Sequence, residues 1–426
     1  MTAPRTLAYR ALRLVLEAGQ QTDEALKESR LSELATRERA FVRVLLMAVL
    51  RDYGRLEKLL KPMLKDPDKI PLEIWAMLLM GTAQLLILKT PPHAAVNETI
   101  ELAVREGLGG FKGLLNAVLR RVDRDGRKDF EKIPQTENFP LWLRISWKSY
   151  PDRANWGEVL SSEPPLDITL KNDPNALKQR SDSAKDWAEK LGGELITSQT
   201  VRITEYGEVA KLAGYDAGAW WVQDVAATFP VTLLGDLRGK EVLDLCAAPG
   251  GKTLQLLAGG AKVTAVDSSA QRLMKLKENL ARTKMTAEIQ CADVLRLEPA
   301  QQYDVVLLDA PCTATGTIRR HPEILIHKQQ DDTHRLAALQ LQMLDAAKAW
   351  VKPGGKLLYC VCSLQREEGE HQMKSFLAAN PEFELMPAKL PDAPQCVTSD
   401  GFLRVLPNHF PGGADGFFAA ALQKSA

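Results

Sequence analysis

The chain has 426 residues, of which 45% are hydrophobic and 26% charged, a composition typical of soluble globular proteins. This length exceeds one ordinary hydrophobic core and predicts two or three domains. The longest apolar run, residues 74–88, contains Gln84 and is shorter than the roughly 20 residues that cross a bilayer. No early segment has a signal-peptide pattern, so we expect a cytoplasmic protein without a membrane segment.

Charge and cysteine are both unevenly distributed. Residues 1–150 hold 25 Lys and Arg against 19 Asp and Glu, whereas the remainder holds 30 against 35. The positive excess suggests that the first part faces a polyanion. All six cysteines follow residue 245, without zinc-site spacing, and the six histidines show no ligand spacing either. We therefore expect free thiols in a reducing compartment and no metal.

Residues 1–130 are predicted to form an all-helical bundle. Apolar positions recur at helical spacing in residues 7–19, 39–60, 74–88, 95–107 and 114–122. Gly and Pro clusters separate these segments, as expected of helices with short links. The last predicted helix ends in a basic cluster that includes Arg120 and Arg121. This cluster is either a solvated helix end or a surface that contacts phosphates.

Three further regions follow the bundle. Residues 131–165 mix Pro, Trp and charge and are interpreted as a linker with a helical stretch. Residues 166–215 show short strand patterns around one helix, which predicts a small α/β subdomain. In residues 216–426, short apolar runs alternate strictly with helical patterns. That alternation predicts a Rossmann-like α/β core with a doubly wound, mostly parallel sheet.

Ligands of open parallel sheets bind at the carboxyl ends of the strands. The first strand leads into DLCAAPGGKT, whose two glycines allow a tight turn and a close approach of the backbone to a ligand. The candidate cofactor-binding residues of this turn are Cys246, Ala247, Ala248, Pro249, Gly250, Gly251 and Lys252. The next three strands end in an acid each: Asp267, Asp293 and Asp309.

These acids suggest which cofactor binds. Asp267 is placed to accept the hydroxyl groups of a ribose, although it or Ser268 could instead cap the next helix. Asp293 could meet an adenine amino group. The sequence has neither GxGxxG nor GxxxxGK[ST], which argues against a dinucleotide and against a P-loop. An adenosyl ligand remains, with S-adenosylmethionine as the obvious candidate.

Two loops carry candidate reactive thiols. Cys312 follows Pro311 after the fourth strand, and GKLLYCVCSL, residues 355–364, brings Cys360 and Cys362 to the end of the fifth. Strand alternation puts Cys360 and Cys362 on one face, with Cys360 further inside as a core residue. The residues alone leave Cys312 and Cys362 as alternative nucleophiles. Cys246 and Cys291, at the ends of predicted buried strands, are interpreted as structural.

CAAPGGKT, DAPCTATGTIRRHPE and the Cys-Ser pair after the fifth strand resemble the RNA (cytosine-5) methyltransferases. PHAAVNETIELA and NAVLRR resemble the NusB-like bundle fused to that enzyme in the bacterial Sun/Fmu/RsmB branch, so the resemblance covers nearly the whole chain. It implies a monomer that methylates carbon 5 of a cytosine in small-subunit ribosomal RNA through a covalent cysteine–cytosine adduct. It also implies that Cys362 attacks and that Cys312 acts in product release. Val361 departs from the family, which commonly has Thr before the attacking cysteine.

The expected chemistry assigns further roles. Asp309 is placed to hydrogen-bond the base at nitrogen 3 if it is held protonated or shares a proton. Lys252 is a candidate positive neighbour for the attacking thiolate. Arg319, Arg320 and His321 are interpreted as phosphate contacts, or else as a helix cap. Lys171 is a further candidate RNA contact. It stands where relatives often carry Arg, so the positive charge is kept but the bidentate geometry of a guanidinium is lost.

Three other functions fit parts of the sequence. A non-catalytic RNA-binding or antitermination factor would use the NusB-like bundle and would not need the thiols. A dehydrogenase would need a dinucleotide site, for which GxGxxG is missing. A DNA methyltransferase would make Cys312 the attacking residue.

Overall fold

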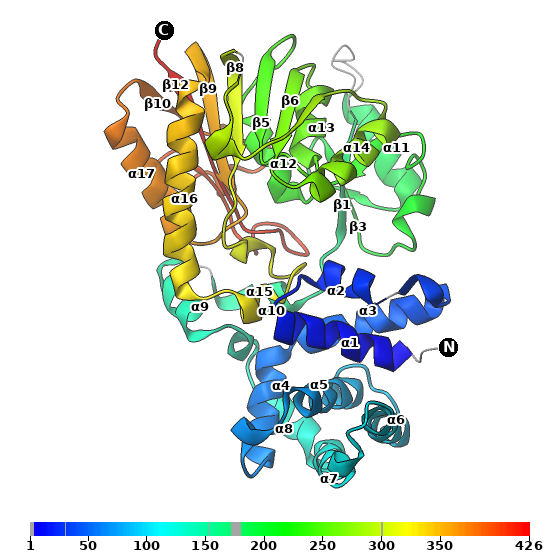
Figure 1. Cartoon of the computed structure of the whole chain (residues 1–426). Coiled ribbons are helices and arrows are strands. Elements are labelled where there is room, and N and C mark those ends of the chain that lie inside the picture. The colour runs from blue at the N-terminus through cyan, green and yellow to red at the C-terminus, as the bar shows by residue number, and fades with distance from the viewer. Residues whose placement is uncertain (1–3, 30, 152, 172–179, 300) are drawn as a thin grey trace. The chain divides into compact units, whose positions relative to one another are not determined.

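The structure is a computed structural model, and it describes residues 4–29, 31–151, 153–171, 180–299 and 301–426 (Figure 1). The chain divides into two compact units. Unit 1 contains Met1–Glu163 together with Ile318–Lys328, and unit 2 contains Pro164–Thr317 and Gln329–Ala426. The chain therefore leaves unit 2 directly after the Pro-Cys loop and returns to it eleven residues later.

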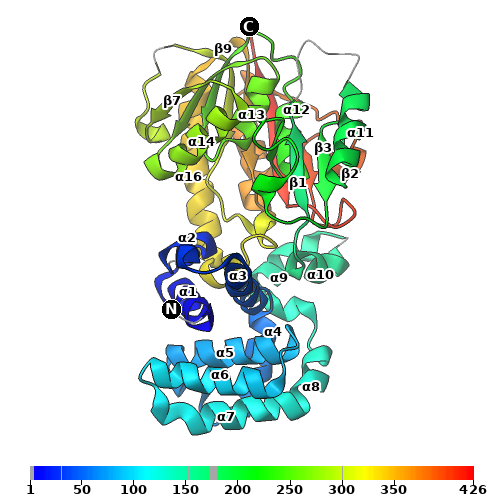
Figure 2. The same ribbon diagram turned by 90° about the vertical axis from the view of Figure 1, so that its right-hand side faces the viewer.

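Unit 1 is helical, as the periodicity predicts. Its helices are α1 (Pro4–Ala18), α2 (Thr22–Glu28), α3 (Thr36–Arg51), α4 (Tyr53–Leu60), α5 (Leu72–Leu86), α6 (Pro92–Arg105), α7 (Lys112–Arg121), α8 (Arg127–Lys132), α9 (Leu141–Ser146), α10 (Trp156–Ser161) and α15 (Ile324–His327). Helix α5 is buried along almost its whole length, and α5, α6 and α7 lie in successive rows (Figure 2). Gly81 allows α5 to approach α7 closely, because a Cβ there would lie 2.8 Å from the side chain of Leu119.

Two features of unit 1 differ from the predicted segments. The predicted helix over residues 39–60 divides at Asp52, which has φ −110° and accepts a hydrogen bond from Arg55 Nη1 at 2.8 Å. Helix α2 lies outside the predicted segments because its seven residues are too few to show a period. Arg55 also lies over the ring of Phe130, 3.9 Å from its centroid.

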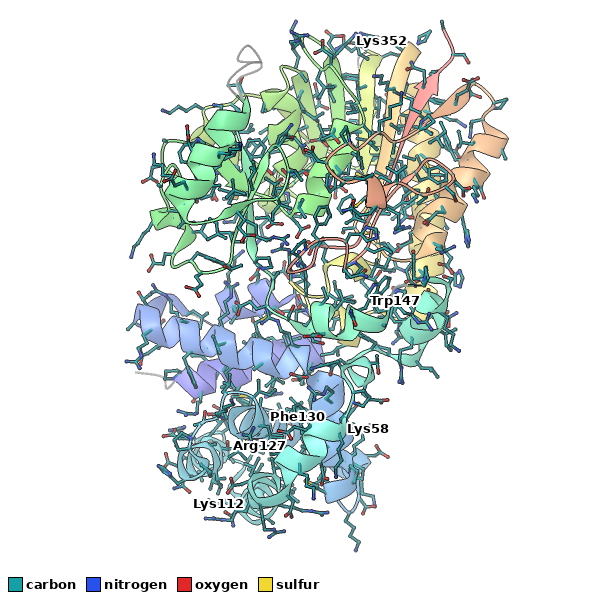
Figure 3. The ribbon with its side chains drawn as sticks, turned by 180° about the vertical axis from the view of Figure 1, so that it is seen from behind. Lys58, Lys112, Arg127, Phe130, Trp147 and Lys352 are labelled. Carbon is teal, nitrogen blue, oxygen red and sulfur yellow. The ribbon has the colours of Figure 1, made fainter. Side chains whose placement is uncertain are left out.

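The region interpreted as a linker, residues 131–165, belongs to unit 1 up to Glu163 and contains α9 and α10. The rings of Phe139, Trp147 and Trp156 form its small core, with Trp147 packed edge-on against both neighbours at 5.4 Å (Figure 3). The tryptophans that make this stretch look irregular in sequence therefore form part of its packed core.

Unit 2 begins with a small antiparallel sheet in the order β2-β3-β1-β4. Its elements are β1 (Leu166–Leu170), α11 (Arg180–Leu191), β2 (Glu194–Leu195), β3 (Thr200–Ile203) and β4 (Trp220–Val222). This sheet extends past the predicted boundary at residue 215, because β4 pairs with β1. Buried Asp167 pairs with Arg202 at 2.7 Å and also accepts from the amide of Val225, where the next helix begins.

The larger sheet has the order β10-β12-β9-β8-β5-β6-β7, with β11 beside β12. Its strands are β5 (Glu241–Leu245), β6 (Lys262–Asp267), β7 (Glu288–Cys291), β8 (Tyr303–Asp309), β9 (Val351–Val361), β10 (Phe383–Met386), β11 (Leu403–Val405) and β12 (Phe417–Lys424). Five neighbouring strands of this sheet, β9, β8, β5, β6 and β7, pair in parallel, as predicted. The closing strand β12 runs antiparallel to β9, and β10 and β11 are additions to the predicted set.

Helices cover both faces of this sheet (Figure 1). They are α12 (Val225–Thr232), α13 (Gly251–Ala258), α14 (Ala270–Thr283), α16 (Gln330–Ala349) and α17 (Glu370–Ala379). Alternate strand residues enter two cores: Val242 packs with α12, α13 and α14, whereas Leu243 packs with α16 and α17. The parallel strands are buried on both faces, which is why their sequences are continuously apolar.

The described residues contain neither a membrane-spanning helix nor a cluster of metal ligands. No helix among them is long and apolar enough to cross a membrane. Within the same residues, no group of three or more His, Cys, Asp and Glu side chains is arranged to hold a metal ion.

Candidate active site at the strand tips

A tight turn connects β5 to α13. Cys246 has φ 59° and Gly250 has φ 106°, both in the left-handed region. A Cβ on Gly250 would lie 2.3 Å from the side chain of Leu276, so glycine is required there. Because α13 begins at Gly251, its unpaired N–H groups lie at the rim of the sheet. The other residues predicted for this turn are Ala247 and Ala248, which are buried, and Pro249, which is exposed.

Asp244, near the end of β5, is fully buried and only half satisfied. Its Oδ2 accepts a hydrogen bond from Thr253 Oγ1 at 2.6 Å, whereas no described group donates to Oδ1. Burial raises the pKa of Asp244 to about 7, although the bond from Thr253 opposes the shift. An unpartnered buried carboxylate oxygen is costly, so this atom is suited to an N–H group of a ligand.

Asp267, at the end of β6, organises the neighbouring turn. It is buried, and its oxygens accept from the amides of Ala248 at 3.1 Å and Ser269 at 2.9 Å. Arg272 forms an ion pair with it at 3.3 Å. The N-cap of α14 is Ser269. The alternative prediction, a cap by Asp267 or Ser268, is therefore wrong, because the helix begins after a later residue. Each carboxylate oxygen can accept a second bond, so a ribose hydroxyl remains chemically compatible.

The end of the next strand, β7, is exposed. Asp293 is exposed, and its side chain accepts from the amide of Leu295 at 3.0 Å, which caps the short turn Val294–Arg296. Cys291 is also exposed, so its interpretation as a buried structural residue is wrong. It ends β7, which is the edge strand and has fewer neighbours to cover it.

Lys252 and Asp309 meet between the tips of β5 and β8. Lys252 Nζ lies 2.7 Å from Asp309 Oδ2 and 4.7 Å from the ring centroid of Phe417. Burial alone would lower the pKa of Lys252, but the Asp309 carboxylate and two neighbouring thiols together outweigh it, so the net pKa is above its ordinary value. Cys360 is fully buried, and its thiol donates to Asp309 Oδ1 at 3.4 Å.

Cys312 and Cys362 lie side by side, with their sulfur atoms 3.5 Å apart. Both are partly exposed, and the amide of Gly316 donates to the carbonyl of Cys362 at 3.0 Å, which joins the two loops. The hydrogen bond with Cys362 and burial raise the pKa of Cys312 well above its ordinary value. The two thiols that the sequence could not rank therefore belong to one site.

The sequence-based interpretation missed the polar network behind these thiols. It consists of Thr313, Gln340, Tyr359, Ser363 and Glu368, all fully buried. The only sequence signal was a polar residue directly after each cysteine. Their shared partner, Glu368, is 55 positions away from Thr313, and no local pattern reports such a contact.

The predicted RNA-contact residues are placed separately. Arg120 and Arg121 are exposed near the end of α7, as a phosphate contact requires. Lys171 is exposed, but its Nζ donates to the Thr283 carbonyl at 2.6 Å, at the C-terminus of α14. The remaining trio falls in the segment that belongs to unit 1.

Within that trio, Arg319 is fully buried, so its guanidinium is not presented to solvent as a surface phosphate contact requires. Arg320 and His321 are half-buried, and His321 Nδ1 lies 3.4 Å from Glu323. The predicted helix cap by these residues is wrong, since Glu323 is the residue that precedes α15.

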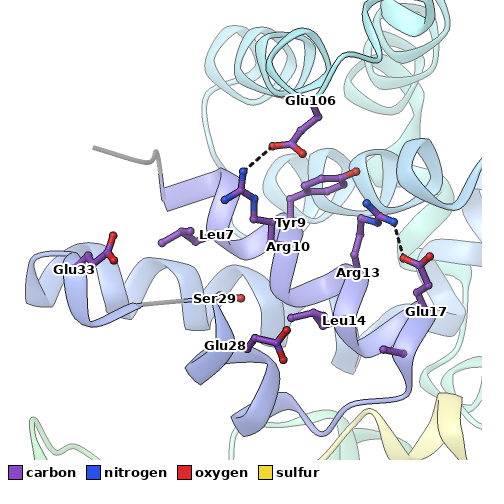
Figure 4. A pocket seen from close by; sticks show the side chains of 11 residues that line it. Leu7, Tyr9, Arg10, Arg13, Leu14, Glu17, Glu28, Ser29, Glu33 and Glu106 are labelled. Atoms are coloured by element: carbon purple, nitrogen blue, oxygen red, sulfur yellow. Dashed lines mark hydrogen bonds and ion pairs between the residues drawn. The ribbon is translucent and has the colours of Figure 1, made fainter.

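Unit 1 also contains a cavity of about 510 Å³ beside α1 (Figure 4). Its two arginines are paired with glutamates, Arg10 with Glu106 at 3.4 Å and Arg13 with Glu17 at 2.6 Å. Tyr9 lines the same cavity, and burial raises its pKa. The residues that line this cavity include no cysteine and lie on helices of unit 1 or next to them.

The fold and this rim define a Rossmann-like methyltransferase that uses S-adenosylmethionine. The solved structure described as PH0851 matches over 100% of this chain and 99% of its own, with a TM-score of 0.78 and 22% identity. A methyltransferase homologue from Pyrococcus horikoshii covers 67% of this chain and 94% of its own, with a TM-score of 0.56 and 25% identity.

Sequence comparison places the chain more narrowly. The family described as 16S rRNA methyltransferase RsmB/F matches residues 231–423, and the NusB family matches residues 2–124. Ribosomal RNA small subunit methyltransferase B of Cronobacter sakazakii is 34% identical over 99% of this chain and 98% of its own length. The protein of the same description from Yersinia pestis is 33% identical over the same shares. The chain belongs to the RsmB/F methyltransferase family.

The residues present fit S-adenosylmethionine. The unpartnered Oδ1 of Asp244 can accept from the ammonium of its methionine part, and the turn from Cys246 to Gly251 leaves backbone groups at the rim. Asp267 and Asp293 lie at the next two strand ends, where a ribose and a base are bound in doubly wound sheets.

Proposed function

We propose that this protein transfers a methyl group to carbon 5 of a cytosine in small-subunit ribosomal RNA through a covalent adduct with Cys362. The observation that carries the proposal is the pair of sulfur atoms 3.5 Å apart at the strand tips. The relatives described as ribosomal RNA small subunit methyltransferases support the substrate class. Exposed Arg120 and Arg121 are proposed to contact phosphates of that RNA.

Carbon 5 of cytosine is a weak nucleophile until a thiolate adds to carbon 6. In this step the sulfur of Cys362 forms a bond to carbon 6, and the ring electrons move toward nitrogen 3 and carbon 5. When bound, the cofactor supplies an electrophilic methyl group on a sulfonium. Splitting one high barrier into two lower ones is the general gain of covalent catalysis.

The pairing of the two thiols is compatible with Cys362 as the attacking residue, the role that the family resemblance implies. Their sulfur atoms are 3.5 Å apart, so Cys312 can donate its hydrogen to a thiolate on Cys362. Lys252 adds a buried positive charge on the same rim. Because Lys252 donates to Asp309, the pair shares a proton, which we propose is offered to nitrogen 3 of the ring as charge develops.

Product release requires loss of the carbon 5 proton. The electrons of that bond form the carbon 5–carbon 6 double bond, and the bond from carbon 6 to the sulfur of Cys362 breaks. We assign the release step to Cys312, whose sulfur adjoins that of Cys362. Once Cys362 is bonded to carbon 6 it no longer accepts from Cys312, which can lose its own proton to solvent. The Cys312 thiolate then takes the carbon 5 proton, and Cys362 leaves as a thiolate.

Substitution of each thiol tests these roles. We expect Cys362→Ala to abolish methyl transfer, with the affinity for S-adenosylmethionine changed by less than about twofold, because only the nucleophile is lost. We expect Cys312→Ala to accumulate a covalent protein–RNA species on denaturing gels. Exposed Cys291→Ala is the matched control and should retain activity.

The substrate is RNA from cells that lack this protein, with labelled cofactor and mapping of the labelled nucleoside. A product other than 5-methylcytidine would contradict the proposed reaction. An adduct that accumulates with Cys362→Ala and not with Cys312→Ala would reverse the two roles.

A further inference from the structure

We propose that Glu368 is the positioning residue that holds the two cysteine loops together. This inference rests on the proposed function for its catalytic consequence, but the geometry that it explains stands apart from activity. Glu368 lies in the short turn Arg366–Glu368, after the end of β9, and is fully buried. It is one of the few buried acids in unit 2 that the chemistry described above does not use.

The carboxylate of Glu368 binds the residue that follows each cysteine. Its Oε1 accepts from the amide of Thr313 at 2.9 Å, and its Oε2 accepts from Thr313 Oγ1 at 2.5 Å. The same Oε2 accepts a short hydrogen bond from the hydroxyl of Ser363. Thr313 follows Cys312 and Ser363 follows Cys362, so one carboxylate joins the two thiol-bearing loops at equivalent positions.

Two further elements hold Glu368 itself in place. Gln340 of α16 donates to Glu368 Oε1 at 3.0 Å and to the Pro311 carbonyl at 2.9 Å. The hydroxyl of Tyr359, on β9, donates to the backbone carbonyl of Glu368 at 2.7 Å. Because helix, strand and both loops meet at this acid, its position is fixed from several directions.

The reaction explains why the two loops need such a constraint. Cys362 acts at carbon 6 and Cys312 at carbon 5, so both sulfurs must stay within reach of adjacent atoms of one ring. Loops without a common support move independently, and a displacement of about 1 Å can cost roughly 10²-fold in rate. Charged acceptors make stronger hydrogen bonds than neutral ones, which suits a carboxylate for this support.

The test measures the distance between the sulfurs without RNA or cofactor. Dibromobimane bridges two neighbouring thiols, each of which displaces one bromide, and it fluoresces once bridged. In the full chain carrying Cys291→Ser, we expect fast bridging of Cys312 to Cys362, confirmed by peptide mapping. Glu368→Gln replaces one acceptor oxygen by an amide that cannot accept, so bridging should slow about tenfold or more.

Two measurements separate positioning from general damage. Labelling of each single thiol by monobromobimane should not slow in Glu368→Gln. In the methylation assay kcat should fall by roughly 10²-fold, while KM for RNA and the affinity for S-adenosylmethionine stay unchanged. Glu367→Gln, at the half-buried neighbouring position, is the matched control and should bridge at the wild-type rate.

Bridging at the wild-type rate in Glu368→Gln would overturn the proposal, and so would an absence of bridging in the parent protein. If Glu368→Gln fails to fold, Ser363→Ala removes the hold on one loop, and an unchanged bridging rate there has the same meaning. A parent protein that bridges but methylates no RNA would refute the proposed function while leaving the role of Glu368 intact.

Discussion

At the scale of single residues, burial decides what each ionisable side chain can do. Lys252 is buried, yet its pKa is raised because the Asp309 carboxylate and two neighbouring thiols together outweigh desolvation. It therefore remains an ammonium at neutral pH and serves as a charge partner, not as a base. Asp244 shows the opposite case: among the residues that the structure describes no cation donates to it, and burial raises its pKa to about 7.

The shift of Asp244 predicts how cofactor binding depends on pH. An ammonium beside Oδ1 favours the ionised carboxyl, so binding below about pH 7 should release a proton. We expect the affinity for S-adenosylmethionine to rise by up to about tenfold per pH unit between pH 5 and 7 and to level off above that. Calorimetry in buffers of different ionisation enthalpy measures both the affinity and the released proton.

Asp244→Asn should flatten this profile, whereas exposed Asp236→Asn should leave it unchanged. A proton uptake on binding would contradict the assignment. The stability of the free protein should show the reverse trend. The folded pKa of Asp244 lies above the unfolded value of 3.8, so its contribution is fully present below about pH 4 and is lost as the pH rises toward 7.

At the scale of elements, the turn between β5 and α13 shows how a strand, a helix and a ligand site depend on one glycine. Gly250 combines φ 106° with a contact that any Cβ would violate. The direction of β12 shows what the local sequence pattern does not predict. Its apolar run predicts a strand, but its antiparallel pairing with β9 depends on the path of the whole preceding chain.

We expect Gly250→Ala to lower the free energy of unfolding by about 1–3 kcal/mol, because it adds backbone strain and a clash with Leu276. The affinity for S-adenosylmethionine should fall as well, since the turn lies at the cofactor rim. Urea titration followed by tryptophan fluorescence measures the first effect. Gly207→Ala, with nothing within 4 Å and no positive φ, is the control and should change stability by less than about 0.5 kcal/mol. Equal effects of the two variants would contradict the role of the turn.

At the scale of the whole molecule, the chain is interleaved: Ile318–Lys328, which directly follows the Pro-Cys loop, folds as part of unit 1. Glu323 of this segment is buried and accepts from the amide of Thr22 at 3.1 Å, at the start of α2. His327 Nε2 lies 2.8 Å from the Val15 carbonyl, and Ile326 packs against the core of the bundle. The bundle is therefore completed by residues far away in sequence.

This interleaving predicts that residues 1–163 alone are less stable than the complete unit. A synthetic peptide of residues 318–328 should raise the thermal midpoint of that fragment, because it restores the partners of Thr22 and Val15. The matched peptide with Glu323→Ala and His327→Ala should not, since a lost partner for a buried backbone group costs about 1–3 kcal/mol. Equal effects of the two peptides, measured by circular dichroism, would contradict the interpretation.

The sequence by itself determined the fold class, the helical first part and the strand tips at which we propose that the chemistry takes place. Those features follow from local periodicity and from turn residues such as Gly250, which act within a few positions of the chain. The motif around Cys312 and Cys362 also determined the family, since it joins rare residues in a fixed order.

Only the tertiary structure decided how distant groups combine. It placed the sulfur atoms of Cys312 and Cys362 3.5 Å apart, placed Glu368 between their loops, and buried Arg319. Each of these outcomes depends on contacts between residues separated by many positions. Such contacts leave no local pattern because hydrogen bonds, burial and the resulting pKa shifts arise from neighbours in space, not from neighbours in sequence.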